Sequence, residues 1–203
     1  MGTARSRVWT IPNLISVARL LCVPVFLWML WKPDPARRGA AVLLAVLGAT
    51  DWVDGWIARH FDQGSELGKI LDPTADRVLL VAAAIALLHE GLSTGVTILL
   101  WIVLAREVLI ALATVALGLA GARRIDVVWA GKAGTLALMF ALPMFLIADA
   151  ARSVRTLFDF LGWGFAIGGI VLGYFAAAKY VPAARTALRE GRTHSLVESK
   201  VVS

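Results

Sequence analysis

Residues 48–59 read "GATDWVDGWIAR" and directly follow the apolar run "AVLLAVL" at 41–47. Two aspartates and an arginine therefore stand at the end of a segment that is otherwise suited to hydrocarbon. Charged side chains are costly inside a membrane, and where they occur they usually carry function. This stretch accordingly indicates both a membrane helix and a functional site at one end of it.

The composition agrees with a membrane protein. Of the 203 residues, 59% are hydrophobic and 17% are charged, whereas soluble domains are about half apolar and about a quarter charged. Apolar runs of the length that crosses a bilayer as a helix, about 20 residues, occur at 12–31, 39–58, 69–89, 95–120, 132–149 and 157–180. The sequence predicts an all-α bundle of six transmembrane helices.

The basic residues predict the orientation of this bundle. With six crossings, one side collects the following lysines and arginines: Arg5, Arg7, Arg59, Lys69, Arg123, Arg124, Lys132, Lys179, Arg185, Arg189, Arg192 and Lys200. The other side keeps Lys32, Arg37, Arg38, Arg152 and Arg155. Because cytoplasmic segments carry the excess of positive charge, we expect a multi-pass protein of the cell membrane with both termini in the cytoplasm.

The net charge of +6 does not indicate a nucleic-acid partner, because no basic helix with interleaved aromatic residues stands outside the expected spans. Residues 1–182 are expected to form one membrane domain, and the polar residues 183–203 a loosely ordered cytoplasmic tail. The stretch "GWGFAIGGIVLG" at 162–173 is rich in glycine. It predicts either a close helix contact, within the bundle or between subunits, or ordinary internal packing.

Four aspartates carry the chemistry. Asp51 and Asp54 are three residues apart, and Asp72 and Asp76 are four apart at the start of the next apolar run. Offsets of three and four place side chains on one helix face, and the short loop between the runs lets the two pairs face each other. Four carboxylates near hydrocarbon need compensating positive charge. Oxygen ligands without cysteine or paired histidines favour Mg²⁺, with Mn²⁺ possible, and two ions fit four aspartates.

Magnesium held by few carboxylates usually completes its shell with water and substrate phosphates. The cluster therefore indicates a phosphate-bearing substrate, and two ions could clamp a diphosphate during phosphoryl transfer. Gly55 and Gly68 leave room for a ligand to approach the backbone, and Arg59 can add a fork of donors to a phosphate.

These residues match a known pattern, D-x2-D-G-x2-A-R-x8-G-x3-D-x3-D, at every fixed position: Asp51, Asp54, Gly55, Ala58, Arg59, Gly68, Asp72 and Asp76. The pattern is the signature of the CDP-alcohol phosphotransferase family, which the chain resembles. The pattern covers 26 residues. The expected six spans, with the pattern between the second and the third, also resemble the family and extend the likeness to about residue 180.

The resemblance implies transfer of a phosphatidyl group from a CDP-linked lipid, usually CDP-diacylglycerol, to an alcohol, with release of CMP. It implies that Asp51, Asp54 and Asp72 hold the metals, and that Asp76 both touches metal and accepts the proton of the attacking hydroxyl. The residues expected to bind the CDP-lipid are Asn13, Ser16, Gly55, Ala58, Arg59, Ser65 and Gly68. A homodimer is expected on the same ground.

The acceptor is predicted from a narrower likeness. The segments "IPNLISVAR" at 11–19 and "LGKILDPTADRVLLVAA" at 67–83 look most like the bacterial branch that uses glycerol 3-phosphate. An acceptor phosphate needs cations, and Arg19, Arg106 and Lys132 are the candidates. Each has a structural alternative: a partner within the fold for Arg19, a pair with Glu107 or a motif aspartate for Arg106, and snorkelling to the interface for Lys132.

Two other functions stay open at this point. A cardiolipin synthase of the same family, with phosphatidylglycerol as acceptor, shares the aspartate motif and "LDPTAD" at 71–76. A cation transporter would also bury acids, but its site normally lies at the midplane among broken helices, whereas these aspartates gather at one membrane face.

Overall fold

The computed structural model describes residues 10–60, 68–119 and 129–201. Across these ranges the fold is entirely helical, without strands. In chain order the elements are α1 (Ile11–Trp31), α2 (Arg37–His60), α3 (Gly68–His89), α4 (Thr94–Leu119), α5 (Trp129–Ala150), the short 3₁₀ helix η1 (Arg152–Val154) and α6 (Arg155–Val201). The predicted all-α fold is confirmed.

Four of the described segments are long and apolar enough to cross a membrane: residues 13–31, 94–115, 129–150 and 152–178. Helices α2 and α3 occupy the positions of the other two predicted spans. Both carry several charged residues, at the end of α2 and at the start of α3. Six crossings therefore stay a prediction.

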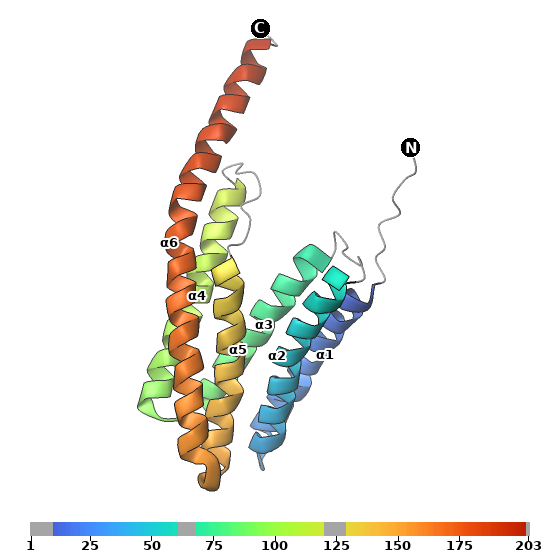
Figure 1. Cartoon of the computed structure of the whole chain (residues 1–203), viewed down its shortest axis with the longest axis vertical. Coiled ribbons are helices and arrows are strands. Elements are labelled where there is room, and N and C mark those ends of the chain that lie inside the picture. Colours follow the sequence, from blue (N-terminus) through green and yellow to red (C-terminus); the bar gives the residue numbers. More distant parts are fainter. Residues whose placement is uncertain (1–9, 61–67, 120–128, 202–203) are drawn as a thin grey trace.

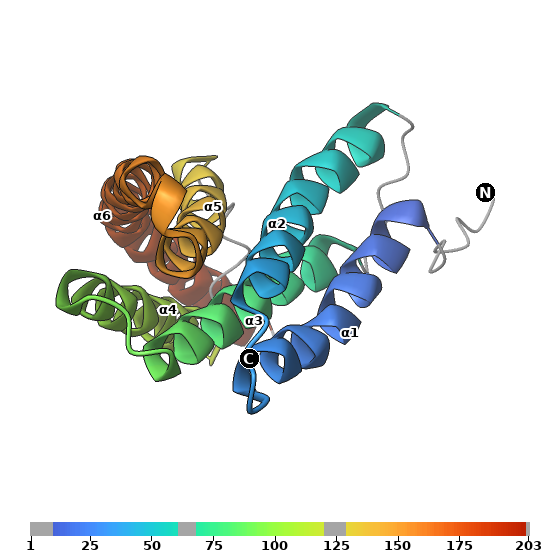
Figure 2. The same ribbon diagram turned by 90° about the horizontal axis from the view of Figure 1, so that it is seen from below.

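The helices form two groups. Helix α1 packs against α2 and α3, while α5 and α6 make the most extensive contact of the bundle and α2 packs on α5. Figures 1 and 2 show α3 lying between α1 and α4, with the α5/α6 pair beside them. The start of α1, the end of α2 and the start of α3 meet at one end of the bundle (Figure 1). This end, called the site end below, carries the aspartate motif.

Helix α1 begins where its sequence predicts. Thr10 is the N-cap residue, its Oγ1 accepting a hydrogen bond from the backbone N–H of Asn13 at 3.4 Å, and Pro12 stands at the first turn, where a missing N–H is harmless. Buried side chains such as Phe26, Leu80 and Leu142 form one apolar core. The partly buried Cys22 packs against it.

The glycine-rich stretch forms a close contact inside the bundle. A Cβ built on Gly134 of α5 would lie 2.8 Å from the carbonyl oxygen of Gly169 and 3.0 Å from the backbone nitrogen of Gly173, both on α6. At distances this short, a side chain at Gly134 fits only if the two helices move apart. The prediction of a close helix contact is confirmed, within one chain.

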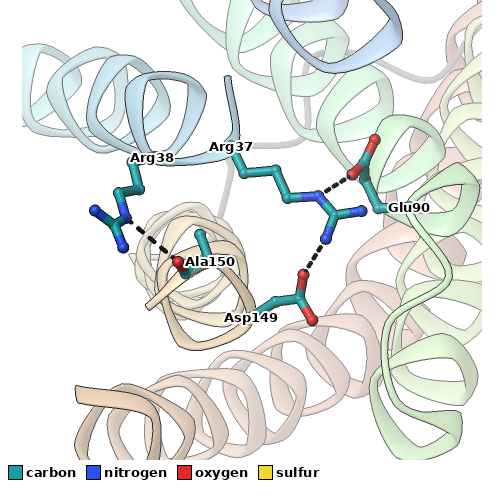
Figure 3. A network of polar contacts seen from close by, with 5 residues as sticks. All are labelled: Arg37, Arg38, Glu90, Asp149 and Ala150. Carbon is teal, nitrogen blue, oxygen red and sulfur yellow. Dashed lines mark hydrogen bonds and ion pairs between the residues drawn. The ribbon is translucent and has the colours of Figure 1, made fainter. Parts of the chain in front are cut away.

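The end of the bundle away from the motif is tied together by ion pairs (Figure 3). Arg37, which begins α2, donates to Glu90 at the end of α3 and to Asp149 near the end of α5, each at 2.6 Å. The neighbouring Arg38 donates to the carbonyl oxygen of Ala150 at 3.3 Å. The start of α2 and the ends of α3 and α5 are thereby held together opposite the motif. The ion pairs are partly exposed, so salt screens them.

The C-terminal residues differ from the expectation of a loose tail. Helix α6 continues without a break to Val201 and projects beyond the other helices (Figure 1). Its sequence after residue 182, "AARTALRE" at 183–190, is rich in good helix formers, so the helix propagates from the packed segment into the polar one. The division into a membrane domain and a tail at residue 182 stays a prediction.

Candidate active site

Helix α1 contacts both aspartates of α3. The hydroxyl of Ser16 donates to Asp72 Oδ1, and Arg19 Nη1 pairs with Asp76 Oδ1. Helices α1 and α3 start at the same end of the bundle (Figure 1). Ser16 and Arg19, three residues apart on α1, therefore meet two aspartates that are four residues apart on α3, in the same order along the chain. The register of this helix pair therefore assigns one polar partner on α1 to each carboxylate.

These contacts lie in a largely water-excluded place. The side chains of Ser16 and Arg19 are fully buried, and that of Asp76 is 18% exposed. A buried arginine needs a nearby negative charge, because removing either member of such a pair leaves an uncompensated charge. Arg19 thus compensates Asp76 and fixes the orientation of its carboxylate.

The other half of the motif lies on α2. The backbone of Asp51, Asp54, Gly55, Ala58 and Arg59 is in the last turns of this helix, next to the start of α3 at the site end (Figures 1 and 2). Their side chains lie outside the described part of the structure, and Ser65 lies outside the described residues altogether. The structure thus brings the two helix segments to one end of the bundle, and the metal-ligand roles stay predictions.

The remaining predicted donor-site residues are at the same end. Gly68 is the first residue of α3 and is buried. Asn13 is 4% exposed and stands one helical turn before Ser16 on α1. Both positions are consistent with contact to a ligand held between α1, α2 and α3.

Asp72 and Asp76 suit a divalent metal chemically. They offer carboxylate oxygens one helical turn apart, which is the donor type that Mg²⁺ and Mn²⁺ prefer. Among the side chains that the structure describes, no group of three or more histidine, cysteine, aspartate or glutamate residues could hold a metal ion. These two carboxylates alone do not complete a site, so the expected one requires Asp51 and Asp54 as well.

A second buried charge cluster lies on α4. Arg106 Nη1 donates to Glu107 Oε1 at 2.7 Å, and both side chains are less than a tenth exposed. This is the structural pair that the sequence offered as the alternative for Arg106. Arg77 of α3 approaches the same glutamate, its Nε 4.0 Å from Glu107 Oε2. Glu107 therefore lies between two arginines from different helices.

Arg106 keeps unused hydrogen-bonding capacity. Its Nε is buried without a hydrogen-bond partner, and a Cβ on Gly173 of α6 would lie 2.6 Å from this nitrogen. An unsatisfied buried donor is costly, which makes the guanidinium a candidate binder of an anion. Lys132 is exposed on α5, as snorkelling predicts. The acceptor-phosphate roles of Arg19, Arg106 and Lys132 stay predictions.

Sequence reasoning named Arg19 and Ser16 but not their partners. It also missed Glu107 as a shared partner of two arginines, and the Arg37 ion pairs at the far end. In the sequence these residues are single charges at helix ends or inside apolar runs. Such positions do not show which residue pairs with which.

A helical membrane bundle with a D-x2-D…D-x3-D motif at one end defines a class of lipid-modifying transferases. Residues 9–175 match the family model described as CDP-alcohol phosphatidyltransferase, and the chain belongs to this family. The resemblance predicted from the motif is confirmed. This membership gives a transferase of membrane phospholipid synthesis whose substrates are a CDP-linked lipid and an alcohol acceptor.

Three relatives are informative. A Streptomyces coelicolor protein named "Cardiolipin synthase (CMP-forming)" is 38% identical over 188 residues, covering 90% of this chain and 86% of the relative. Two relatives are named "CDP-diacylglycerol–glycerol-3-phosphate 3-phosphatidyltransferase". The one from Pseudomonas fluorescens is 31% identical, with 94% and 98% coverage. The one from Shigella flexneri serotype 5b is 30% identical, with 89% and 97% coverage.

Proposed function

We propose that this chain transfers the phosphatidyl group of CDP-diacylglycerol to a terminal glycerol hydroxyl of phosphatidylglycerol, giving cardiolipin and CMP. The observation that carries this choice of acceptor is the identity of 38% to the relative named as a CMP-forming cardiolipin synthase, against 31% and 30% to the two glycerol-3-phosphate enzymes. The sequence motifs alone favoured glycerol 3-phosphate, although the aspartate motif and "LDPTAD" at 71–76 are shared by both branches.

Glycerol 3-phosphate is the second candidate acceptor. Its phosphate carries two negative charges, whereas the phosphodiester of phosphatidylglycerol carries one. Arg19 and Arg106 are each paired with a carboxylate, Asp76 and Glu107 respectively, and Lys132 is exposed. Much of the cationic charge near the site is thus already compensated, which supports the acceptor of lower charge. The unused Nε of Arg106 is the feature that favours an acceptor phosphate in either case.

The reaction proceeds by attack of the acceptor hydroxyl on the phosphorus atom that bears the diacylglycerol. A bond forms between that oxygen and the phosphorus, the bond from phosphorus to the bridging oxygen of the diphosphate breaks, and CMP leaves with the electron pair. The hydroxyl proton passes to the carboxylate of Asp76. Arg19 orients this carboxylate through Oδ1, and the hydroxyl of Ser16 holds Asp72.

Asp51, Asp54, Asp72 and Asp76 would hold two Mg²⁺ ions, or Mn²⁺. When bound, such ions neutralise a diphosphate and stabilise the charge that develops on the leaving group. Arg59 and the residues Asn13, Ser16, Gly55, Ala58, Ser65 and Gly68 surround the CDP moiety in this proposal.

The same proposal includes the arrangement in the cell. Helices α2 and α3 also cross the membrane, which gives six spans with both termini and the active site on the cytoplasmic side of the cell membrane. The protein acts as a homodimer.

An acceptor screen tests the proposal. Purified protein receives labelled CDP-diacylglycerol and Mg²⁺ with phosphatidylglycerol, glycerol 3-phosphate or inositol phosphate in separate reactions, and the lipid product is identified by mass spectrometry. We expect cardiolipin from phosphatidylglycerol. Phosphatidylglycerophosphate as the main product would assign the second acceptor, and the absence of CMP release with every acceptor would contradict the proposal.

A further inference from the structure

An apolar groove runs along α3 on its side toward α1. It has a volume of about 420 Å³ and is lined by Leu27 and Trp31 of α1 and by Arg77, Val78, Val81, Ala82 and Ile85 of α3. Arg77 is the single charged residue in this lining. Its neighbour Asp76 is the proposed base, so the groove begins at the level of the reaction and runs away from the site end.

The dimensions of the groove suit one lipid chain. Arg77 and Ile85 are eight residues apart, which at 1.5 Å per residue is about 12 Å along the helix. One leaflet contributes about half of the roughly 30 Å hydrocarbon core. An acyl chain that enters at Arg77 can therefore follow the whole groove. Val78 and Ile85 are each more than two fifths exposed, so this face of α3 is open to such a ligand.

The charge of the groove suits a phosphodiester. The Arg77 side chain is 41% exposed, and its ion pair with Glu107 is long, at 4.0 Å. The guanidinium can thus turn donors toward the groove while remaining near Glu107. Its planar fork matches the geometry of phosphate oxygens, and a phosphate on Arg77 places the attached headgroup beside Asp76.

We infer that this groove is the acceptor-lipid site. One acyl chain of phosphatidylglycerol lies along Val78, Ala82 and Ile85, the phosphodiester binds Arg77, and the glycerol headgroup reaches Asp76. This inference rests on the proposed function, because glycerol 3-phosphate has no acyl chain that could occupy the groove. A second copy of the chain is another occupant to be tested. A lipid is favoured over it because charged residues are depleted from the cores of protein interfaces, whereas an anionic phosphodiester complements Arg77.

A binding experiment tests the site without turnover. The full-length protein is placed in vesicles of phosphatidylcholine with a small fraction of lipid brominated on the acyl chains, and tryptophan fluorescence is recorded. The signal of Trp31 is obtained as the difference between the wild type and Trp31→Phe. We expect brominated phosphatidylglycerol to quench Trp31 more than brominated phosphatidylcholine does, and Arg77→Gln to abolish this preference. Trp101 of α4, which is 61% exposed and outside the groove, is the control and should show no preference.

A kinetic experiment tests its use in the reaction. Val78→Trp fills the groove, and Val171→Trp on α6 adds the same side chain at an exposed position outside it. We expect Val78→Trp to raise the KM for phosphatidylglycerol about tenfold with an unchanged KM for CDP-diacylglycerol, a loss equivalent to about 1.4 kcal/mol, and Val171→Trp to leave both unchanged.

The outcomes separate the two proposals. Equal quenching of Trp31 by both brominated lipids, or equal kinetics of the two tryptophan variants, would overturn the groove assignment even where cardiolipin is made. Dissociation of a dimer by Val78→Trp, without selective quenching, would overturn it in favour of a second copy. Selective quenching in a protein that makes no cardiolipin would contradict the proposed acceptor chemistry while leaving the lipid site in place.

Discussion

Replacing Gly134 by alanine tests the packing that holds α5 against α6. The new Cβ would lie 2.8 Å from Gly169 O and 3.0 Å from Gly173 N. Both obstructing atoms belong to backbone, which no rotamer change can move, so the helices must separate by a few tenths of an ångström. Inserting a methyl group into a packed contact costs about 1–3 kcal/mol, while alanine in place of glycine in a helix gains up to about 1 kcal/mol.

Gly168→Ala supplies a matched control on α6, because a Cβ there meets nothing within 4 Å. Both substitutions gain the same helix propensity, so the difference between the two variants isolates the clash. We expect Gly134→Ala to be about 1–3 kcal/mol less stable than Gly168→Ala. Reversible unfolding of purified protein in mixed detergent micelles, followed by circular dichroism, measures this difference. Equal stability of the two variants would refute the close contact.

The remaining predictions concern the site. Asp76→Asn should abolish CMP release while labelled CDP-diacylglycerol still binds, and turnover at the wild-type rate would remove Asp76 from the role of base. Arg19→Gln should destabilise the protein by up to about 3–5 kcal/mol, because it removes the buried charged partner of the Asp76 carboxylate, and by clearly less in the Asp76→Asn background; an identical loss of unfolding free energy in both backgrounds would show that the residues are not coupled. Arg106→Ala should raise the KM of the acceptor far more than that of the donor, and Gly173→Ala should act in the same direction because its Cβ would lie 2.6 Å from Arg106 Nε. An acceptor KM that neither substitution changes would withdraw Arg106 from the acceptor pocket.

Much of the fold follows from the sequence because each helix is encoded locally. The apolar runs predicted at 69–89 and 12–31 are observed as the helices Gly68–His89 and Ile11–Trp31. Residues 13–31 also meet the length and apolarity of a membrane span, whereas a crossing by α3 stays a prediction. The exception is α6, which continues to Val201. A change from apolar to polar residues does not by itself end a helix, and residues 183–190 are rich in good helix formers.

The candidate site was predictable to the extent that it depends on spacing along one helix. The offset of Asp72 and Asp76 places them on one face regardless of the rest of the fold. Their partners Ser16 and Arg19 depend on the register between α1 and α3, more than fifty residues apart, and side-chain packing sets this register. The same reason hid the pairing of Arg37 with Asp149, which are 112 positions apart.

The groove on α3 could not be predicted from the sequence. Val78, Val81 and Ile85 read as part of an ordinary apolar run, and only the arrangement of α1 beside α3 shows that they line a cavity with Arg77 at one end. The proposed acceptor site therefore depends on packing between helices, whereas the proposed donor site rests on a motif of 26 residues that can be read from the sequence.

The central claim is that four aspartates from α2 and α3 together bind divalent ions that hold the diphosphate of the donor. A high-resolution structure with Mg²⁺ and CDP-diacylglycerol tests it most directly. We expect oxygens of Asp51, Asp54, Asp72 and Asp76 at about 2.0–2.1 Å from two ions, with the diphosphate bridging them. Carboxylates of α2 too far from those of α3 to share the ions, or a diphosphate bound elsewhere on the protein, would contradict the account.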